Sequence, residues 1–362
     1  MEIFKEFRDR AELNYASALP LKWKQESGGH LIYREELRYS GYPMALPQGF
    51  EEPDTGGFHF NGTGDYVLKP LLECVGDPWI SQELYRTSED KLKLLALAGW
   101  KHGYYVNVPQ GSKAELQVEA EDCGHRLIVR AQEASELNLS VNFASKNMCN
   151  RFNASSVQVY AERGSKVTLN YATSSSGSNF FDLEGHLDSG SDMSLSALHV
   201  SGEYSRHFGS VDLATGSSVR LLIGDFVPKR AFGDSMFVVK HGANSTSDVQ
   251  MRATVFGKGV IRGITGVKTG AKGSKANLQE RVLMIGEEAK AITSPSLDIY
   301  EKEVEARHGS WSGRIGSKEL FYLESRGLTE EQAIALLIRG MFGPFFIVPM
   351  FSEILGGVIN AQ

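Results

Sequence analysis

The sequence predicts a mainly β protein with a parallel β-helix core, an N-terminal α/β region and a small C-terminal helical module. The first observation behind this prediction is a repeat in the middle of the 362-residue chain. A glycine followed by a small residue recurs there, with three intervals of 26 residues and a fourth of 28. Such a period is typical of stacked architectures, in which each unit buries its apolar face against its neighbours. The repeated pairs are Gly164-Ser165, Gly190-Ser191, Gly216-Ser217, Gly242-Ala243 and Gly270-Ala271.

The second observation is that each period holds two strand-like segments and no segment long enough for a crossover helix. Residues 167–171 alternate with period two, and residues 180–187 follow after a Ser/Gly turn. Strands at this spacing favour a parallel β-helix, with a β-sandwich or jelly roll as the alternative. Glycine suits the sharp corners because it tolerates positive φ. We expect corners at Gly164, Gly190, Gly216 and Gly242, and inward-facing side chains at Val167, Leu169, Val219 and Leu221.

The third observation is that both ends of the chain differ from the repeat. Residues 1–105 mix helical patterning with aromatic-rich loops, and residues 87–90 open a helix with leucines on its apolar side. Residues 106–305 contain the repeat and form the predicted β-helix core. Residues 306–362 form the predicted C-terminal helical module. The chain is therefore divided into three regions.

Two short helices are predicted in the C-terminal module. Residues 317–322 begin the first helix, and Gly327 ends it. Thr329 and Gln332 have the spacing of a capping box, which indicates the start of the second helix. We therefore expect a helical pair after the β body.

The end of this module is strongly apolar and approaches the length of a membrane span. Residues 341–359 contain Pro344, Pro349 and Glu353, however, and their apolar runs are broken. An interrupted segment of this kind is a poor transmembrane helix. We expect a docked or partner-facing segment and no membrane span.

Composition and charge argue against several classes of protein. The net charge of −6 and the lack of a Lys/Arg stripe argue against nucleic-acid binding. Cys74, Cys123 and Cys149 form a sparse, odd set, which argues against a disulfide framework or a zinc site. The acidic N-terminal residues 1–6 do not resemble a signal peptide, so we expect a cytoplasmic protein. The chain has neither a Walker motif nor a nucleophile elbow, so another chain would have to bind any ATP.

Three segments resemble the C-terminal signature of the SufB/SufD proteins. These are a proline-containing strand at 295–300, a His-Gly turn within 304–309 and a Leu-Phe-Tyr-Leu-x-Ser-Arg-Gly helix at 320–327. The resemblance implies a right-handed β-helix scaffold for iron–sulfur cluster assembly, not an enzyme. It also implies two partners, a SufC-like ABC ATPase and a SufB-like protein or a second copy of this chain. The pairing contact is expected near residues 280–310, and a transient cluster would be shared across it.

Within this family the chain resembles the SufD-like branch. SufB-type members carry a cysteine in the strand that matches residues 279–286, and Glu280 stands nearest that position here. The later turn reads His308-Gly309, as in SufD-like members. The resemblance therefore makes His308 the candidate metal or cluster ligand at a subunit interface, because imidazole suits iron. The alternative is a turn histidine that caps the last coil through a backbone hydrogen bond.

The resemblance also places the ATPase contact on the C-terminal helices. The alternative is that their apolar side chains only pack the module against the β-helix. One departure from the family is residues 343–349, which replace an expected amphipathic acidic helix. The candidate ATPase-binding residues are Leu320, Phe321, Tyr322, Arg326, Leu336 and Leu337.

Other polar residues allow weaker hypotheses. Cys123-Gly124-His125 looks like a metal site, but an acidic turn explains it equally well. The spacings of His186, His199 and His207 favour ordinary positions in the wall of the β-helix. Two alternative functions remain, a structural adaptor without metal chemistry and a carbohydrate-active enzyme using paired carboxylates. The candidate carboxylates, which we expect to face solvent, are Asp182, Glu184, Asp188, Asp212 and Asp225.

Overall fold

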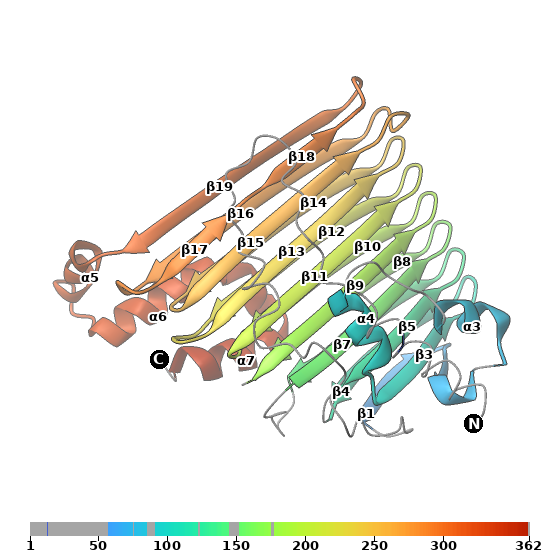
Figure 1. Ribbon diagram of the computed structural model, residues 1–362, viewed down its shortest axis with the longest axis horizontal. Coiled ribbons are helices and arrows are strands. Elements are labelled where there is room, and N and C mark those ends of the chain that lie inside the picture. Colours follow the sequence, from blue (N-terminus) through green and yellow to red (C-terminus); the bar gives the residue numbers. More distant parts are fainter. Residues whose placement is uncertain are drawn as a thin grey trace.

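Two sheets of alternate strands form a parallel β-solenoid, which confirms the predicted mainly β fold and its β-helix core (Figure 1). The computed structural model describes residue 13 and residues 57–74, 76–84, 91–121, 124–144, 152–174 and 177–360. Within these residues the predicted alternative of a β-sandwich or jelly roll is wrong, because the strands of each sheet run parallel from coil to coil.

Each coil contributes one strand to each sheet. Sheet 1 contains, in spatial order, β1 (Phe58–Gly64), β4 (Lys113–Ala120), β6 (Glu136–Ala144), β8 (Lys166–Ser174), β10 (Asp192–Val200), β12 (Ser218–Val227), β14 (Thr246–Val255), β16 (Lys275–Ile285) and β19 (Glu305–Ile315). Sheet 2 contains β17 (Lys290–Thr293), β15 (Lys258–Val267), β13 (Phe232–His241), β11 (Tyr204–Leu213), β9 (Ser178–Leu187), β7 (Phe152–Ala161), β5 (His125–Ala131), β3 (His102–Val108) and β2 (Val67–Pro70), with β18 (Ser296–Ile299) paired to β15.

The strands stack in register with their neighbours one coil before and after. Asp192 of β10 pairs with Lys166 of β8 on one side and with Ser218 of β12 on the other. The first coil is different, because β1 and β2 pair antiparallel with β4 and β3. This pairing covers the N-terminal edge of both sheets. A solenoid edge without such a cover presents unpaired backbone groups.

A column of residues with positive φ marks one turn of each coil. Gly190 has a φ of +69° and donates its backbone N–H to Thr215 O at 3.1 Å. Gly216 has a φ of +70° and donates in the same way to Ala243 O at 2.9 Å. Glycine adopts this conformation without strain. The turns are therefore joined from coil to coil by their own ladder of hydrogen bonds.

Three of the four predicted corner glycines belong to this column, and the fourth does not. Gly164, Gly190 and Gly216 have positive φ, as expected. Gly242 also lies at its predicted corner, between β13 and β14, where the backbone of Leu213 comes close to it, but Asn244 takes the positive φ of 55° there and donates its N–H to Lys272 O. Asparagine is one of the few other residues that tolerate this region. The 28-residue step from Gly216 to Asn244 shows that this coil is longer by two residues.

The core lies between the two sheets and consists mainly of aliphatic side chains. The four residues predicted to face inward, Val167, Leu169, Val219 and Leu221, are at most 3% exposed and belong to this core. They alternate with exposed or half-buried residues along β8 and β12. Each such burial stabilises the fold by about 1.5–3 kcal/mol, so the repeated stack holds the shape.

Short helices of the N-terminal region cover sheet 2. These are η1 (Leu71–Glu73), α3 (Pro78–Leu84) and α4 (Lys91–Ala98). Leu92 and Leu94 of α4 pack against Ala154 of β7 and Phe180 of β9, which confirms the predicted helix and its apolar side. Residues 87–90, which are predicted to open this helix, lie outside the described residues.

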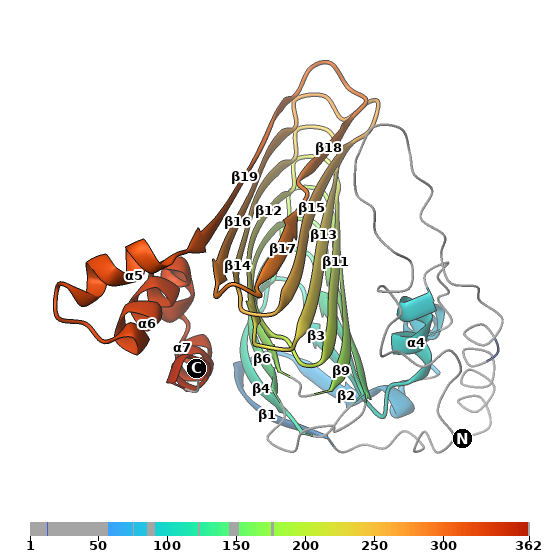
Figure 2. The same cartoon turned by 60° about the vertical axis from the view of Figure 1, so that its left-hand side comes forward.

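The C-terminal module lies against the outer face of sheet 1, on the opposite side of the solenoid from α4 (Figure 2). It contains α5 (Ser317–Glu324), α6 (Glu330–Met341), η2 (Gly343–Ile347) and α7 (Pro349–Asn360). The predicted capping box is present, because Thr329 Oγ1 accepts from Gln332 N at 3.2 Å and Gln332 Oε1 accepts from Thr329 N at 3.0 Å. The two predicted helices are therefore confirmed.

The apolar end of the chain is docked on the solenoid. Phe342, Phe345 and Leu355 are fully buried in one cluster with Leu198 of β10 and Phe226 of β12. This packing explains the strongly apolar sequence of residues 341–359 without a lipid environment. Among the described helices, none has both the length and the apolar character needed to cross a membrane.

Candidate functional site

The last coil of the solenoid is open. Within the described residues, β19 pairs with β16 alone, so its other edge is uncovered. The corresponding part of sheet 2 is reduced to β17 and β18, which have four residues each. Most of β19 is exposed, including Trp311 at 51%. A long exposed edge strand offers a template for pairing with another chain.

His308 lies on this edge strand. Its Nδ1 is 3.1 Å from Pro295 O, and the side chain is exposed. A proton on Nδ1 donated to this carbonyl leaves the Nε2 lone pair for a ligand. The contact therefore agrees with the hypothesis that His308 is a turn histidine with a backbone hydrogen bond. It also agrees with the hypothesis that His308 is a metal or cluster ligand, because it fixes the orientation of the ring.

Glu280 of β16 lies on the same face of sheet 1 as His308. In the register of β16 and β19, Leu278 is opposite His308 and Glu280 is opposite Ser310. Glu280 is 1% exposed, and its Oε1 accepts a hydrogen bond from Gly263 N at 2.6 Å. Burial raises the pKa of this carboxyl to about 7. A buried carboxyl group with a raised pKa thus lies one coil before the open edge strand.

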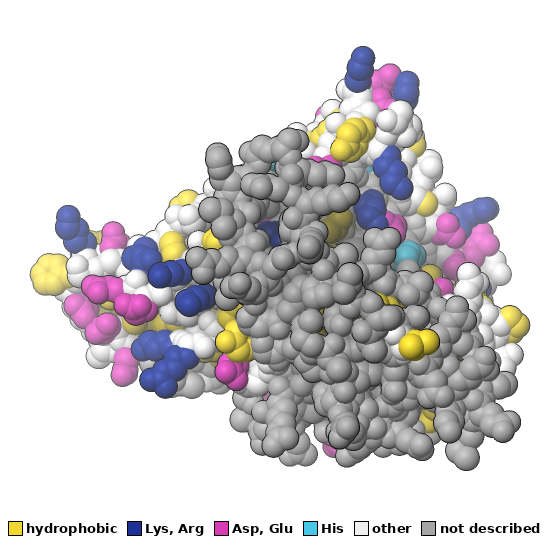
Figure 3. Space-filling view, in the orientation of Figure 1, with side chains coloured by type: hydrophobic (Ala, Val, Ile, Leu, Met, Phe, Trp, Pro, Cys, Tyr) yellow, Lys and Arg dark blue, Asp and Glu magenta, His cyan; other side chains and the backbone are white. Residues whose placement is uncertain are grey.

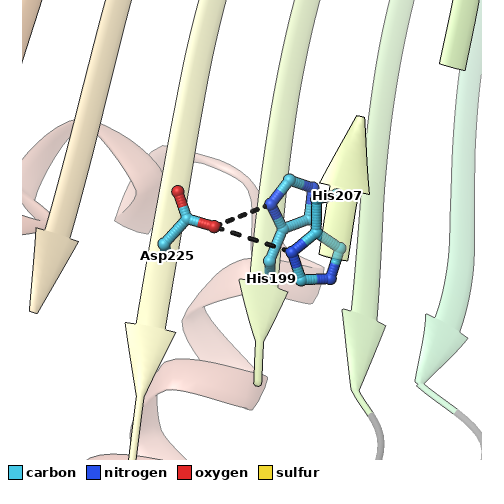
Figure 4. Close-up of side chains that lie close together, drawn as sticks. All are labelled: His199, His207 and Asp225. Atoms are coloured by element: carbon cyan, nitrogen blue, oxygen red, sulfur yellow. Dashed lines mark hydrogen bonds and ion pairs between the residues drawn. The ribbon is translucent and has the colours of Figure 1, made fainter. Parts of the chain in front are cut away.

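A second polar cluster lies deep in the core. His199 of β10, His207 of β11 and Asp225 of β12 bring their side chains together between the two sheets (Figure 4). His199 Nδ1 is 3.0 Å and His207 Nδ1 is 3.8 Å from Asp225 Oδ1. The two imidazole rings stack with their centroids 3.8 Å apart. All three side chains are at most 2% exposed.

The register of the strands explains why these three side chains lie together. His199 and Asp225 are direct partners in the pairing of β10 with β12, so their side chains point to the same side of sheet 1. His207 enters from sheet 2, where it pairs with Ser235 of β13. The hydroxyl group of Ser235 also donates a hydrogen bond to Asp225 Oδ1. The cluster therefore depends on the backbone ladders of both sheets.

Hydroxyl and amide groups surround the outer nitrogens of both rings. Tyr171 Oη is 3.0 Å from His199 Nε2, and Thr173 Oγ1 is 3.2 Å from His207 Nε2. Burial lowers the pKa of His199 to about 3 and that of His207 well below its usual value. Burial also raises the pKa of Asp225 to about 6. Both rings are therefore neutral near pH 7.

The structure does not bring the other sequence candidates to this cluster. His125 is buried beside Phe58 and Phe143, with its Nε2 2.7 Å from Glu121 O. Its proposed neighbour Cys123 lies outside the described residues. His186 is half-buried and stacks on Tyr160. The prediction of ordinary wall positions thus fits His186, whereas the structure puts His199 and His207 in the polar cluster.

Only two of the five candidate carboxylates, Asp188 and Asp212, line the same surface pocket among the described residues. Asp182 and Asp225 are buried, so the expectation that they face solvent is wrong. Asp182 and Glu184 lie 3.4 and 2.9 Å from Lys93 Nζ, which places them in an ion-pair network with α4. Paired catalytic carboxylates of a glycosidase need a shared, open groove. Asp188 and Asp212 share such a hollow, whereas Asp182, Glu184 and Asp225 do not belong to its lining.

The candidate ATPase-binding residues divide into two groups. Phe321 and Tyr322 of α5 and Leu336 of α6 are 70%, 58% and 52% exposed, whereas Leu320 and Leu337 pack against the buried cluster of the module. The guanidinium of Arg326 lies 5.4 Å from the centre of the Tyr322 ring. Apolar and charged side chains intermingle on the surface of this module, at the left of Figure 3.

Sequence reasoning missed Asp225 as a partner of His199, although a signal was present. The two residues are 26 residues apart, which is the interval of the glycine repeat. Residues one period apart become neighbours in adjacent coils. The contribution of His207 from the other sheet had no equivalent signal, because the distance across the core does not follow from the period.

The fold and these sites define a class of β-solenoid protein with an open terminal coil and a helical module on one face. Residues 116–341 match the family model described as "SUF system FeS cluster assembly, SufBD core domain", and the chain belongs to this family.

Several curated relatives support this membership. The iron–sulfur cluster assembly protein SufB of Bacillus subtilis is 22% identical over 321 residues, which cover 82% of this chain and 66% of that protein. SufD of the same organism is 33% identical over 118 residues, or 33% of this chain and 24% of that protein. A SufBD family protein of Staphylococcus saprophyticus is 24% identical over 291 residues, which cover 71% of this chain and 59% of that protein. The chain thus spans about two thirds or less of the length of these relatives.

Proposed function

We propose that this chain is the SufD-like, non-enzymatic scaffold of a cytoplasmic iron–sulfur cluster assembly complex. The observation that carries the proposal is the last coil, where His308 is exposed and Glu280, which the sequence resemblance puts nearest the SufB-type cysteine position, is buried. A carboxyl group cannot accept sulfur in the way a thiolate does. The sulfur-accepting thiol would therefore come from a partner chain, and His308 would supply a nitrogen ligand.

The partner is proposed to pair along β19. The uncovered edge of this strand offers backbone groups, and its exposed side chains, Trp311 among them, offer contact area. A SufB-like chain is favoured over a second copy, because two copies of this chain would place a glutamate on both sides and lack the thiolate. A transient cluster would then be held between the two chains.

Reconstitution with candidate partners tests this proposal. The chain would be co-expressed with a SufB-like and a SufC-like protein from the same genome, purified without oxygen and analysed for iron and sulfide. We expect a stable complex that loses most of its iron and sulfide when His308→Ala is introduced. His59→Ala is the matched control, because His59 is also exposed but lies at the opposite end of sheet 1.

Two results would contradict this role. An intact complex with equal iron and sulfide in the His308→Ala and wild-type forms would favour the structural adaptor without metal chemistry. A chain that forms only homodimers when the SufB-like protein is present would contradict the heteromeric assignment.

We further propose that the SufC-like ATPase binds the exposed side of α5 and α6. The supporting observation is that Phe321, Tyr322 and Leu336 are exposed large apolar residues on two helices that contact each other. Arg326 beside Tyr322 adds a charge to the same surface. Aromatic and Arg side chains are frequent hot spots of protein interfaces.

A double variant tests this contact better than a truncation, because truncation would uncover the apolar cluster beneath α7. Phe321→Ala with Tyr322→Ala removes two exposed rings and leaves the packed residues in place. We expect at least a tenfold loss of ATPase affinity. Ile347→Ala is the matched control, since Ile347 is 83% exposed on η2 of the same module. Unchanged affinity in the double variant would place the contact elsewhere.

A further inference from the structure

We propose that His199, His207 and Asp225 form a binding site for a divalent transition-metal ion inside the solenoid. This site is distinct from the last coil and goes beyond the proposed scaffold function. Three ligand atoms, one from each residue, lie within 4.8 Å of one another (Figure 4). The residues come from three strands in two sheets, so folding of the solenoid assembles the site.

The two inner ring nitrogens converge on one carboxylate. His199 Nδ1 and His207 Nδ1 lie 3.0 and 3.8 Å from Asp225 Oδ1. Metal–nitrogen and metal–oxygen bonds in such sites are about 2.0–2.2 Å long. The two rings stack at an interplanar angle of 13°, so an ion between the three groups requires one imidazole to tilt as well as a movement of the Asp225 side chain. The backbone need not move, because adjacent strands already hold His199 and Asp225 in register.

The outer ring nitrogens have partners that suit a metal site. His199 Nε2 faces Tyr171 Oη at 3.0 Å, and His207 Nε2 faces Thr173 Oγ1 at 3.2 Å. A hydroxyl group can either donate or accept a hydrogen bond. Asn179 Nδ2 also lies 3.4 Å from His207 Nε2, so a proton on that nitrogen requires the Asn179 amide to present its oxygen instead. With that orientation, and with each Nε2–H donating to its hydroxyl partner, both Nδ1 lone pairs are on the side of Asp225. Outer partners of this kind fix the tautomer of metal-binding histidines.

Two polar atoms of the cluster have no hydrogen-bond partner within the part of the chain that the structure describes. These atoms are His207 Nδ1 and Asp225 Oδ2, and both are fully buried. Buried polar atoms without a partner are unfavourable in folded proteins, so each calls for an explanation. A metal ion would accept electron pairs from both atoms. The neutral state of the two imidazoles also leaves them ready to bind, since a protonated ring has no free lone pair.

The ligand set indicates the class of metal. Two imidazole nitrogens and one carboxylate suit Zn²⁺, Co²⁺ or Fe²⁺, whereas Mg²⁺ and Ca²⁺ prefer oxygen ligands. The competing explanation is a metal-free network in which His199 Nδ1–H donates to Asp225 and Tyr171 donates to His199 Nε2. Ser235 supports that network by donating to Asp225 Oδ1. The two states differ in the tautomer of His199 and in metal content.

Metal binding by the purified chain alone distinguishes these states. The full-length, tag-free protein would be stripped with chelator, dialysed against Zn²⁺ or Co²⁺ at neutral pH and analysed for metal content. We expect close to one ion per chain, a Co²⁺ absorption spectrum with nitrogen and oxygen ligation, and a higher melting temperature with Zn²⁺. His207→Gln and Asp225→Asn should each weaken binding at least tenfold and abolish the thermal shift.

Two further variants act as controls, and a third tests the role of an outer hydrogen-bond partner. His241→Gln alters another buried histidine, held by Ser245 and Ser247, and should bind metal like the wild type. His308→Ala should also bind normally, because His308 lies at the last coil. Tyr171→Phe keeps the volume of the core and removes only an outer partner, so it should fold and bind about 10–100-fold more weakly.

The outcomes separate this site from the proposed function. Wild-type protein without bound metal, or with equal metal in the Tyr171→Phe, Asp225→Asn and wild-type forms, would overturn the site. Loss of metal in His308→Ala alone would also overturn it and would assign the metal to the last coil. These measurements use no partner chain. A negative result would therefore rule out the internal metal site without contradicting the scaffold proposal, which the reconstitution experiment tests separately.

Discussion

The ring of Phe345 occupies the space that a side chain at position 224 would need. A Cβ atom added to Gly224 of β12 would lie 2.7 Å from Phe345 Cζ and 3.0 Å from Phe342 Cε1. Both rings are fully buried, so they have little room to move. A glycine on the outer face of sheet 1 thus allows the C-terminal module to sit close to the solenoid.

We predict that Gly224→Ala destabilises the protein by about 1–3 kcal/mol, the usual cost of overpacking a core. Gly266→Ala is the matched control, because a Cβ there would have only one neighbouring atom among the described residues, at 3.9 Å. Urea unfolding of both variants measures the difference in free energy. Equal stability of the two variants would show that the Phe345 contact does not constrain position 224.

The turn column predicts which substitutions the corners tolerate. Gly216 has a φ of +70°, and a Cβ added to it would meet no atom of the described residues within 4 Å, so only backbone strain opposes a side chain there. Gly216→Ala should cost about 1 kcal/mol. Gly216→Asn should cost less, since Asn244 occupies the equivalent turn of the next coil. Thermal unfolding of the two variants provides the test, and a more stable alanine variant would contradict the strain argument.

The raised pKa of the buried Glu280 carboxyl group predicts how the stability of the protein depends on pH. Its pKa rises from 4.5 in the unfolded chain to about 7 in the folded protein, mainly through burial. Between these values the folded protein holds a proton that the unfolded chain has released. This group therefore lowers the free energy of unfolding as the pH rises from 4.5 to 7.

Glu280→Gln should remove this contribution while its amide oxygen still accepts from Gly263 N. The stability of the variant relative to the wild type should rise by about 1–3 kcal/mol between about pH 5 and pH 8. Urea unfolding at several pH values measures this difference. The comparison cancels the opposite contributions of His199 and His241, whose pKa values are lowered. A constant difference across this range would show that Glu280 ionises normally.

The capping box of α6 predicts a local effect. Thr329→Ala removes the acceptor for Gln332 N and should lower stability by about 0.5–2 kcal/mol. Thr329→Ser keeps the hydroxyl group that accepts this hydrogen bond, so the variant should lose little stability. Chemical denaturation followed by circular dichroism compares the two. A serine variant as unstable as the alanine variant would mean that the lost methyl group, not the cap, matters.

The sequence allowed the core of the fold to be predicted because the repeat is local. Glycines at a constant interval and alternating residues such as Val167 and Leu169 reflect steric and burial requirements that each coil meets separately. Gly242 lies at its predicted corner, but in this longer coil Asn244 takes the positive φ. A sequence pattern does not show which residue of a longer coil takes positive φ.

The site was less predictable for a physical reason. His308 was found through a motif, and its exposure on β19 agrees with the role proposed for it. The burial of Asp225 was not foreseen, since a charged residue on a strand usually faces solvent. Only its position between His199 and His207, one from each sheet, explains why a carboxyl group lies in the core. That arrangement depends on how the two sheets face each other, which local patterns do not encode.

The coil-to-coil register also has a consequence for how this chain reaches its fold. Lys113 pairs with Glu136 near one end of the solenoid, and Lys258 pairs with Lys290 near the other. These parallel partners are 23 and 32 residues apart, and the entropy of closing loops of such similar length is nearly the same for every coil. Folding can begin at any adjacent pair of coils and extend in both directions. The time needed to form the scaffold should therefore depend on its weakest neighbouring pair of coils, and not on the distance between its ends.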